Sequence, residues 1–298
     1  MTDSAGQQGG TTWRQLLKET TEVLDDRQHA RWMCEVASGV DNGDALLAEL
    51  DEPATQRMVA HLDAMIARRL TGEPLQYVLG TWQFRRLDLM VDRRVLIPRP
   101  ETEWVCETAL SLARAMWATS SRAPVTAVDL GTGSGAIGLS LAAELPVGSL
   151  RIWMTDISSD ALDVARANLA GIGRAGAAVQ ICEGSWFSGL PASLRGEIDL
   201  VVANPPYIAD GDEQVSADVT TWEPHLALFA GADGLRDIRT IIGDAVDWLR
   251  PGAWLVIEIG SDQGAAVSSL LGAAGFADLE IRADLAGRDR IAIGSRPT

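Results

Sequence analysis

The spacing of hydrophobic residues along the chain changes near residue 125. Beyond it, short apolar runs rich in β-branched residues alternate with segments in which apolar residues recur every three to four positions. This alternation predicts strands joined by helices, and therefore a mostly parallel sheet. Strands are predicted at residues 125–130, 150–156, 178–182, 198–203, 254–259, 279–283 and 290–294. Helices are expected after the first two strands and at residues 235–249 and 263–273, with a loop over residues 209–233.

The preceding part of the chain has helical spacing instead. Apolar positions predict one helix beginning at Trp13 and another at residues 27–37, followed by a turn at residues 39–44. A longer helix is expected to run from Pro53 to Leu70, because proline is favoured in a first turn. Extended runs near residues 82–84 and 87–91 predict a hairpin, and a further helix begins near Pro100.

These patterns divide the chain into four parts. Residues 1–12 are predicted to be a disordered tail, and residues 13–72 a helical domain that serves as a lid or recognition module. Residues 73–98 form a hairpin linker, and residues 99–298 form the α/β domain.

Composition narrows the classes of function. The 298 residues carry a formal net charge of −16 without any block of lysine and arginine, which argues against a nucleic-acid surface. The apolar runs are too short to span a membrane, and the polar N-terminus has no signal-peptide pattern. Three widely spaced cysteines favour a reducing cytoplasm over a disulfide scaffold. The three histidines lack the spacing of metal ligands, so no metal site is expected.

A glycine-rich turn separates the first predicted strand from its helix. It consists of Gly131, Thr132, Gly133, Ser134 and Gly135. Such a turn lets a ligand approach the backbone, and the helix N-terminus offers free N–H groups. The turn has neither the strict G-x-G-x-x-G spacing of dinucleotide sites nor the Gly-Lys-Ser/Thr of a P-loop.

Two side chains at later strand ends extend this candidate site. Asp156 ends the second strand, where its carboxylate could accept hydrogen bonds from both hydroxyls of a ribose. Trp186 follows the third strand, where it could cover an adenine by stacking or pack in the core. A tight turn with a capping aspartate is the alternative interpretation. Together with Asp129 before the turn, the pattern resembles the S-adenosylmethionine site of class I methyltransferases.

The fourth predicted strand ends at an Asn-Pro-Pro-Tyr segment. Because neither Pro205 nor Pro206 donates a ladder hydrogen bond, the strand stops and presents Asn204 at its C-terminal end, where α/β proteins bind ligands. Taken alone, Asn-Pro is equally well explained as a turn. Beside a methyl donor, the Asn204 oxygen and the Pro205 carbonyl can accept the two hydrogens of an amide nitrogen. Tyr207 can then pack against the flat amide.

These motifs resemble those of the protein-(glutamine) methyltransferases of the HemK/PrmC family. The segments that carry the resemblance are residues 72–77, 96–103, 131–135, 204–208, 222–224, 230–235 and 287–290. The resemblance implies a class I S-adenosylmethionine-dependent methyltransferase fold: a Rossmann-like, mostly parallel seven-stranded sheet with a small N-terminal helical domain.

The resemblance also implies a cofactor, a substrate and the residues that contact them. S-adenosylmethionine is expected on Gly131, Thr132, Gly133, Ser134, Gly135, Asp156, Trp186 and Asn204. The substrate is expected on Asn204, Pro205, Pro206 and Tyr207, with Asn204, Pro205 and Tyr207 catalytic. The implied acceptor is the glutamine of the Gly-Gly-Gln loop in class 1 peptide chain release factors.

Three alternatives stay open. A sister enzyme methylates a glutamine of a large-subunit ribosomal protein, but it is expected to have Pro-Arg-Ser where this chain has Pro98-Arg99-Pro100. An amino-methyltransferase of DNA or RNA is disfavoured by the acidic balance. A binding protein without activity is disfavoured by the intact motifs. The chain departs from the family at Arg85-Arg86, where an aromatic-Gly pair is expected, and at Trp222, where tyrosine is usual.

Overall fold

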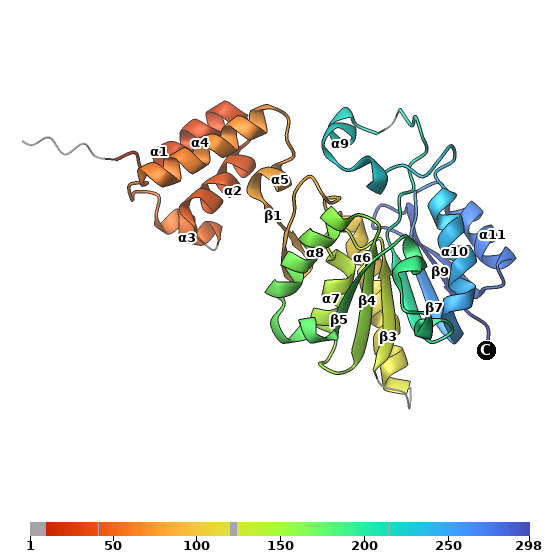
Figure 1. Cartoon of the computed structure of the whole chain (residues 1–298). Coiled ribbons are helices and arrows are strands. Elements are labelled where there is room, and N and C mark those ends of the chain that lie inside the picture. The colour runs from red at the N-terminus through yellow and green to blue at the C-terminus, as the bar shows by residue number, and fades with distance from the viewer. Residues whose placement is uncertain (1–9, 41, 120–123, 214) are drawn as a thin grey trace, which may run out of the picture. The chain divides into compact units, whose positions relative to one another are not determined.

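The computed structural model of the chain describes residues 10–40, 42–119, 124–213 and 215–298. They form two compact units, which are divided between Gly80 and Thr81 (Figure 1). The predicted tail over residues 1–12 lies mostly outside the described residues. The helical unit extends beyond the predicted boundary at residue 72, because helix α5 (Leu75–Leu79) belongs to it.

The described part of the first unit contains five helices around one buried cluster. Arg68 donates hydrogen bonds to both carboxylate oxygens of Glu73, at 2.9 and 2.8 Å, and to the Tyr77 carbonyl at 2.8 Å. These bonds hold α5 against the end of α4, and Leu75 joins the buried cluster with Trp13. The other helices are α1 (Trp13–Leu24), α2 (Arg27–Ser38), α3 (Gly43–Ala48) and α4 (Gln56–Leu70).

Two predictions for this unit are wrong. Helix α4 begins at Gln56 rather than at Pro53, because Thr55 supplies the capping oxygen and Pro53 forms an antiparallel bridge with Thr12. The predicted turn over residues 39–44 leads directly into α3. The Asn42 side chain caps this helix by accepting hydrogen bonds from the N–H groups of Asp44 and Ala45.

The second unit begins with a hairpin and a long helix and then forms a seven-stranded sheet. Strands β1 (Thr81–Phe84) and β2 (Leu87–Met90) pair antiparallel, as predicted, and α6 (Pro100–Thr119) follows. The sheet has the order β5-β4-β3-β6-β7-β9-β8. Its strands are β3 (Val125–Leu130), β4 (Leu150–Asp156), β5 (Val179–Glu183), β6 (Ile198–Ala203), β7 (Leu249–Glu258), β8 (Ala277–Ala283) and β9 (Asp289–Ser295).

Strands β3 to β7 pair parallel, and only β9 pairs antiparallel with its neighbours β7 and β8. The side chains of each strand alternate between two faces, and both faces are buried in the central strands. Helices α10 (Arg236–Trp248) and α11 (Gly264–Ala273) share one buried cluster with the sheet. Helices α6 and α7 (Ala136–Glu144) lie outside that cluster, and they contact β7 and β4 respectively. The predicted α/β class with a mostly parallel seven-stranded sheet is confirmed.

The chain order reverses at β3, which pairs with β4 on one side and β6 on the other. Such a reversal opens a crevice at the carboxyl ends of the strands, where ligands bind in this class of fold. Helix α8 (Ser159–Gly171) follows β4. The predicted loop over residues 209–233 is wrong in part, because it contains α9 (Ala217–Trp222) and a 3₁₀ turn at His225–Ala227. Within the described ranges, no helix is both long and apolar enough to cross a membrane.

Candidate active site

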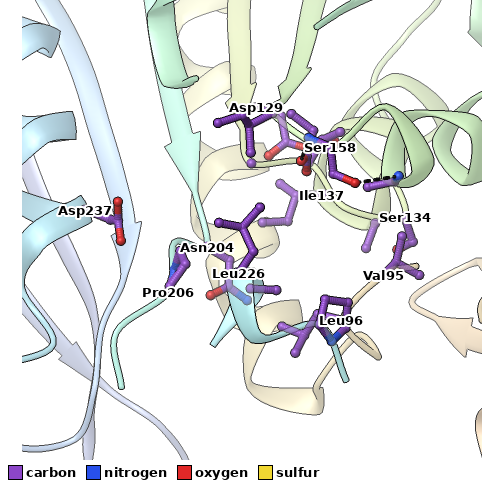
Figure 2. A pocket seen from close by; sticks show the side chains of 18 of the residues that line it. Val95, Leu96, Asp129, Ser134, Ile137, Ser158, Asn204, Pro206, Leu226 and Asp237 are labelled. Carbon is purple, nitrogen blue, oxygen red and sulfur yellow. Dashed lines mark hydrogen bonds between the residues drawn. The ribbon is translucent and has the colours of Figure 1, made fainter. Parts of the chain in front are cut away.

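A cavity of about 250 Å³ lies at the carboxyl ends of β3, β4 and β6 (Figure 2). Its wall comes from the second unit alone and includes side chains from the glycine turn, the strand ends and the segment after α9. The predicted site residues that line it are Gly131, Thr132, Ser134, Asp156, Trp186, Asn204 and Pro206. Gly133, Gly135, Pro205 and Tyr207 are not among its lining residues.

The glycine turn fits closely against the segment that follows β5. Gly131 has a φ of +68°, a left-handed conformation that side-chain-bearing residues rarely adopt. A Cβ on Gly131 would lie 3.0 Å from the Trp186 ring. Trp186 itself has a φ of +50°, and its backbone carbonyl accepts a hydrogen bond from Thr155 at 3.0 Å. The turn therefore requires glycine for both conformation and space, because the Trp186 ring lies against Gly131. Stacking of Trp186 on an adenine stays a prediction.

Asp129 is buried at the base of the cavity. Its Oδ2 accepts hydrogen bonds from the Thr132 hydroxyl at 2.5 Å and from the Gly138 N–H at 2.9 Å. Its Oδ1 has no hydrogen-bond partner among the described residues. Burial raises the pKa of Asp129 to about 6, although the two hydrogen bonds oppose the rise. An unpartnered, buried carboxylate oxygen is a suitable acceptor for a positively charged ligand group.

Asp156 is held by backbone groups. Its Oδ2 accepts from the Gly133 N–H and its Oδ1 from the Ser158 N–H, both at 2.9 Å. Burial raises its pKa, and these bonds oppose the rise. Gly133 thus serves the site indirectly, by fixing a carboxylate that lines the cavity.

Asn204 stands at the end of β6, as the sequence predicts. Its Nδ2 donates to the Thr102 hydroxyl at 3.1 Å, and the Thr102 hydroxyl donates to Glu258 Oε2 at 2.7 Å. Because the amide nitrogen is engaged by Thr102, the Asn204 oxygen is the atom left for another donor. Thr102, on α6, and Glu258, at the end of β7, are site residues that the sequence analysis missed.

Tyr207 contacts this same cluster. Its hydroxyl donates to Glu258 Oε1 at 3.3 Å. Burial raises the pKa of Tyr207, and the neighbouring Glu258 raises it further, so the phenol stays protonated. Tyr207 is not among the lining residues of the cavity, and its predicted packing against a substrate amide stays a prediction.

Glu223 links two of the motifs that the sequence places far apart. It is buried, and its carboxylate accepts from the Ile97 N–H at 3.1 Å and from the Arg99 guanidinium. The neighbouring Trp222 ring lies 4.0 Å from the Arg93 guanidinium. The segments around residues 97 and 223, which both border the cavity, are thereby joined.

Arg85, where the sequence departs from the family pattern, has an internal role. Its φ is +53°, a conformation that glycine adopts more readily. Its guanidinium donates to Glu144 at 2.6 and 3.0 Å and to Glu107 at 2.7 Å. These ion pairs compensate the unfavourable backbone, so Arg85 is engaged within the unit.

Comparison with known proteins identifies the family. The family model described as methyltransferase small domain matches residues 111–222, and the model described as PrmC N-terminal domain matches residues 11–80. A release factor glutamine methyltransferase of Burkholderia pseudomallei is 43% identical over 255 residues, covering 85% of this chain and 86% of the relative. A relative of the same name from Geobacter sulfurreducens is 37% identical, and the match covers 92% of this chain and 90% of the relative. The chain belongs to the release factor glutamine methyltransferase family.

Membership in this family makes the chain a methyltransferase and confirms the resemblance drawn from the motifs. The solved hMettl16 catalytic domain, in complex with an RNA hairpin, is similar in fold only. It is 14% identical, with a TM-score of 0.54 and coverage of 84% of each chain.

The family's methyl donor is S-adenosylmethionine, and two observations in the cavity fit it. The unpartnered Asp129 Oδ1 matches the positively charged amino group of the methionine part. Gly131 lines the cavity without a side chain, which matches a close approach of a ligand to the backbone. Asp156 and Trp186 are the residues that would hold the adenosine part. Among the residues described, no group of three potential metal ligands occurs.

The residues missed by the sequence analysis share one property. Thr102, Glu223 and Glu258 are ordinary polar residues, and the sequence alone assigns none of them a contact in the site, although Thr102 and Glu223 lie within segments that carry the family resemblance. Each contacts a motif residue across a separation of 51 to 156 positions. Gly138, in the helix after the glycine turn, also contributes to the site, because its N–H holds Asp129.

Proposed function

We propose that this enzyme transfers a methyl group to the side-chain amide of the glutamine in the Gly-Gly-Gln loop of class 1 peptide chain release factors. The observation that carries the proposal is the Asn204 amide. It lines the cavity, its nitrogen is engaged by Thr102, and its oxygen remains available to a substrate N–H. The names of the relatives support the acceptor protein.

The chain's own residues supply binding and orientation. When bound, S-adenosylmethionine supplies an electrophilic methyl group on a sulfonium. A glutamine amide is a weak nucleophile because its nitrogen lone pair is delocalised into the carbonyl. The Asn204 oxygen and the Pro205 carbonyl accept hydrogen bonds from its two hydrogens and favour a pyramidal nitrogen. Catalysis then consists of holding the amide in line, so that the nitrogen–methyl bond forms as the sulfur–methyl bond breaks. No strong base is needed before transfer, because the alkylated nitrogen is acidic and loses its proton afterwards.

The helical unit completes the proposal. Residues 13–72, with α5 added by the structure, serve as the recognition module for the release factor. The enzyme acts in the cytoplasm, as the three unpaired cysteines suggest. The acidic balance of the chain supports a protein acceptor over a nucleic acid.

The test is methyl transfer from labelled S-adenosylmethionine to purified class 1 release factor. Parallel samples contain the release factor with Gly-Gly-Gln changed to Gly-Gly-Ala, large-subunit ribosomal proteins and a DNA duplex. Label on the intact release factor alone is expected. Label on a ribosomal protein or on DNA, with none on the release factor, overturns the proposed substrate.

Asn204→Ala tests the mechanism. Removing the amide oxygen is expected to lower kcat by about 10²- to 10³-fold, as for the loss of one preorganised hydrogen-bond group. The circular dichroism spectrum is expected to stay native. Asn42→Ala, in the helical unit, is the matched control and is expected to keep kcat. Near-normal turnover by the Asn204 variant would refute the assigned role.

A further inference from the structure

A chain of polar groups behind the cavity leads from Asn204 into the core. Asn204 Nδ2 donates to Thr102 Oγ1 at 3.1 Å, Thr102 donates to Glu258 Oε2 at 2.7 Å, and Tyr207 donates to Glu258 Oε1 at 3.3 Å. Thr102 and Glu258 have exposed fractions of 3% and 1%. Water therefore cannot easily replace a missing partner in this series of hydrogen bonds, and each proton has a defined place.

The proton count determines which way the Asn204 amide faces. A threonine hydroxyl has one hydrogen, and an ionised carboxylate can only accept. With Glu258 ionised, the Thr102 hydrogen must point to Glu258, so the Thr102 oxygen can only accept. Asn204 must then present its NH₂ group to Thr102. The reversed amide would place two oxygens against each other without a hydrogen between them.

We propose that Thr102, oriented by Glu258, is a positioning residue that directs the Asn204 oxygen toward the methyl acceptor. The inference deepens the proposed function and rests on it, because this orientation lets the Asn204 oxygen accept a hydrogen bond from a substrate N–H. When Glu258 is protonated, Thr102 is no longer obliged to donate to it. The hydroxyl hydrogen can then turn to Asn204, and the reversed amide becomes stable.

The surroundings of Glu258 make this change accessible near neutral pH. Burial raises the pKa of Glu258 to about 7, and Glu101 on α6 contributes to the rise. The Thr102 and Tyr207 hydroxyls and Arg290 on β9 oppose it. Arg290 is itself paired loosely with Asp284, at 3.7 Å. The ionised form of Glu258 is therefore present above about pH 7 and is lost below it, so catalytic turnover is expected to rise with pH through this value.

The orientation of the amide is directly observable. The chain has three asparagines, Asn42, Asn168 and Asn204, so protein labelled with ¹⁵N only at asparagine gives three side-chain NH₂ pairs. The pair lost in Asn204→Ala is that of Asn204. In the wild-type protein its shift is expected to titrate with a midpoint near pH 7. In Glu258→Gln and in Thr102→Val the shift is expected not to titrate, while the other two pairs stay at their wild-type positions.

This experiment needs no methyl acceptor, so it separates the inference from the proposed substrate. An Asn204 pair that ignores pH in the wild-type protein, or that titrates unchanged in Thr102→Val, overturns the inference whatever the enzyme methylates. Failure of the wild-type enzyme to label a release factor overturns the proposed substrate and leaves the titration result in place.

Steady-state kinetics give the second readout. Thr102→Val keeps the side-chain shape, and it is expected to lower kcat about 10- to 100-fold through misplacement of the Asn204 oxygen. The affinity for S-adenosylmethionine is expected to remain. Thr102→Ser restores the hydroxyl and is expected to recover kcat to within about threefold. Thr108→Val, a buried threonine on the same helix, is the matched control and is expected to leave kcat unchanged.

A purely structural role for Thr102 predicts a different outcome. Loss of stability in both Thr102→Val and Thr102→Ser, with kcat of the folded fraction unchanged, would overturn the inference. So would a Glu258→Gln variant whose kcat retains the wild-type dependence on pH. The expected Glu258→Gln profile is flat across pH 7, because glutamine cannot ionise.

Discussion

The replacement of Asp129 by asparagine is expected to stabilise the protein and to weaken its cofactor binding. The two side chains have the same shape. An asparagine oxygen in the place of Oδ2 keeps the hydrogen bonds from Thr132 and Gly138, which are 2.5 and 2.9 Å long in the wild-type protein. The NH₂ group then occupies the place of Oδ1, which has no partner within the described part of the chain. Asp129→Asn therefore removes a buried charge and disturbs few contacts.

The size of the stabilisation follows from the pKa. Burial raises the pKa of Asp129 from 3.8 to about 6. At about 1.4 kcal/mol per pKa unit, the ionised form costs the folded state about 3 kcal/mol. An unpartnered NH₂ group in the same place costs about 1 kcal/mol, which leaves a net gain of about 2 kcal/mol. For a domain of this size the gain corresponds to a Tm increase of about 4–8 °C.

The sign depends on pH. A carboxyl group with a raised folded-state pKa destabilises the protein fully above about pH 6 and not at all below about pH 4, where it is protonated in both states. The Tm advantage of Asp129→Asn is thus expected at pH 8 and is expected to vanish as the pH falls through the window from 6 to 4. Thermal unfolding monitored by circular dichroism across this range provides the measurement.

Cofactor affinity is expected to change in the opposite direction. A charge-assisted hydrogen bond from the cofactor's amino group contributes about 1.5–3 kcal/mol, so its loss raises the Kd by about 10- to 100-fold in isothermal titration calorimetry at pH 8. Wild-type affinity is expected to rise with pH through about 6, as Asp129 ionises. A variant that melts below the wild type at pH 8, or that binds S-adenosylmethionine equally well, would refute the role assigned to Oδ1.

Two further predictions concern glycine and arginine positions. Gly131→Ala is expected to weaken S-adenosylmethionine binding at least about tenfold, because it combines a left-handed backbone penalty of about 1–2 kcal/mol with a Cβ pressed against Trp186. Gly148→Ala has a comparable φ of +86° with open space around it, and it is expected to lose stability without losing affinity. Arg85→Ala is expected to reduce the free energy of unfolding by about 3–5 kcal/mol in a urea titration, since it leaves the buried Glu144 without its main partner. Arg86→Ala is the control, because Arg86 is 80% exposed, and equal losses from the two variants would contradict the importance of the buried pair.

Local sequence patterns were sufficient to locate the cavity. The glycine turn, Asp156 and Asn204 each follow a predicted strand, and the carboxyl ends of parallel strands meet at one edge of a sheet. The alternation of strands and helices therefore placed these residues together before any contact was known. Errors occurred where a single capping side chain decides a boundary, as at Thr55 and Asn42.

Long-range contacts were beyond the reach of the same patterns. Thr102 contacts Asn204 across 102 positions and Glu258 across 156, and nothing in the local sequence around Thr102 or Glu258 indicates these partners. The direction of the Tyr207 hydroxyl is likewise decided by Glu258 and not by the Asn-Pro-Pro-Tyr segment itself.

The sequence by itself determined the class of fold, the edge of the sheet that carries the cavity, and the residue types that stand at the ends of the strands there. These properties depend on local periodicity, on backbone chemistry at glycine and proline, and on the order of elements. The tertiary structure alone decided the electrostatic state of the site. The pKa values of Asp129 and Glu258 rise because surrounding chain segments remove water from their carboxyl groups. That desolvation is a property of packing in three dimensions, and no local stretch of sequence contains it.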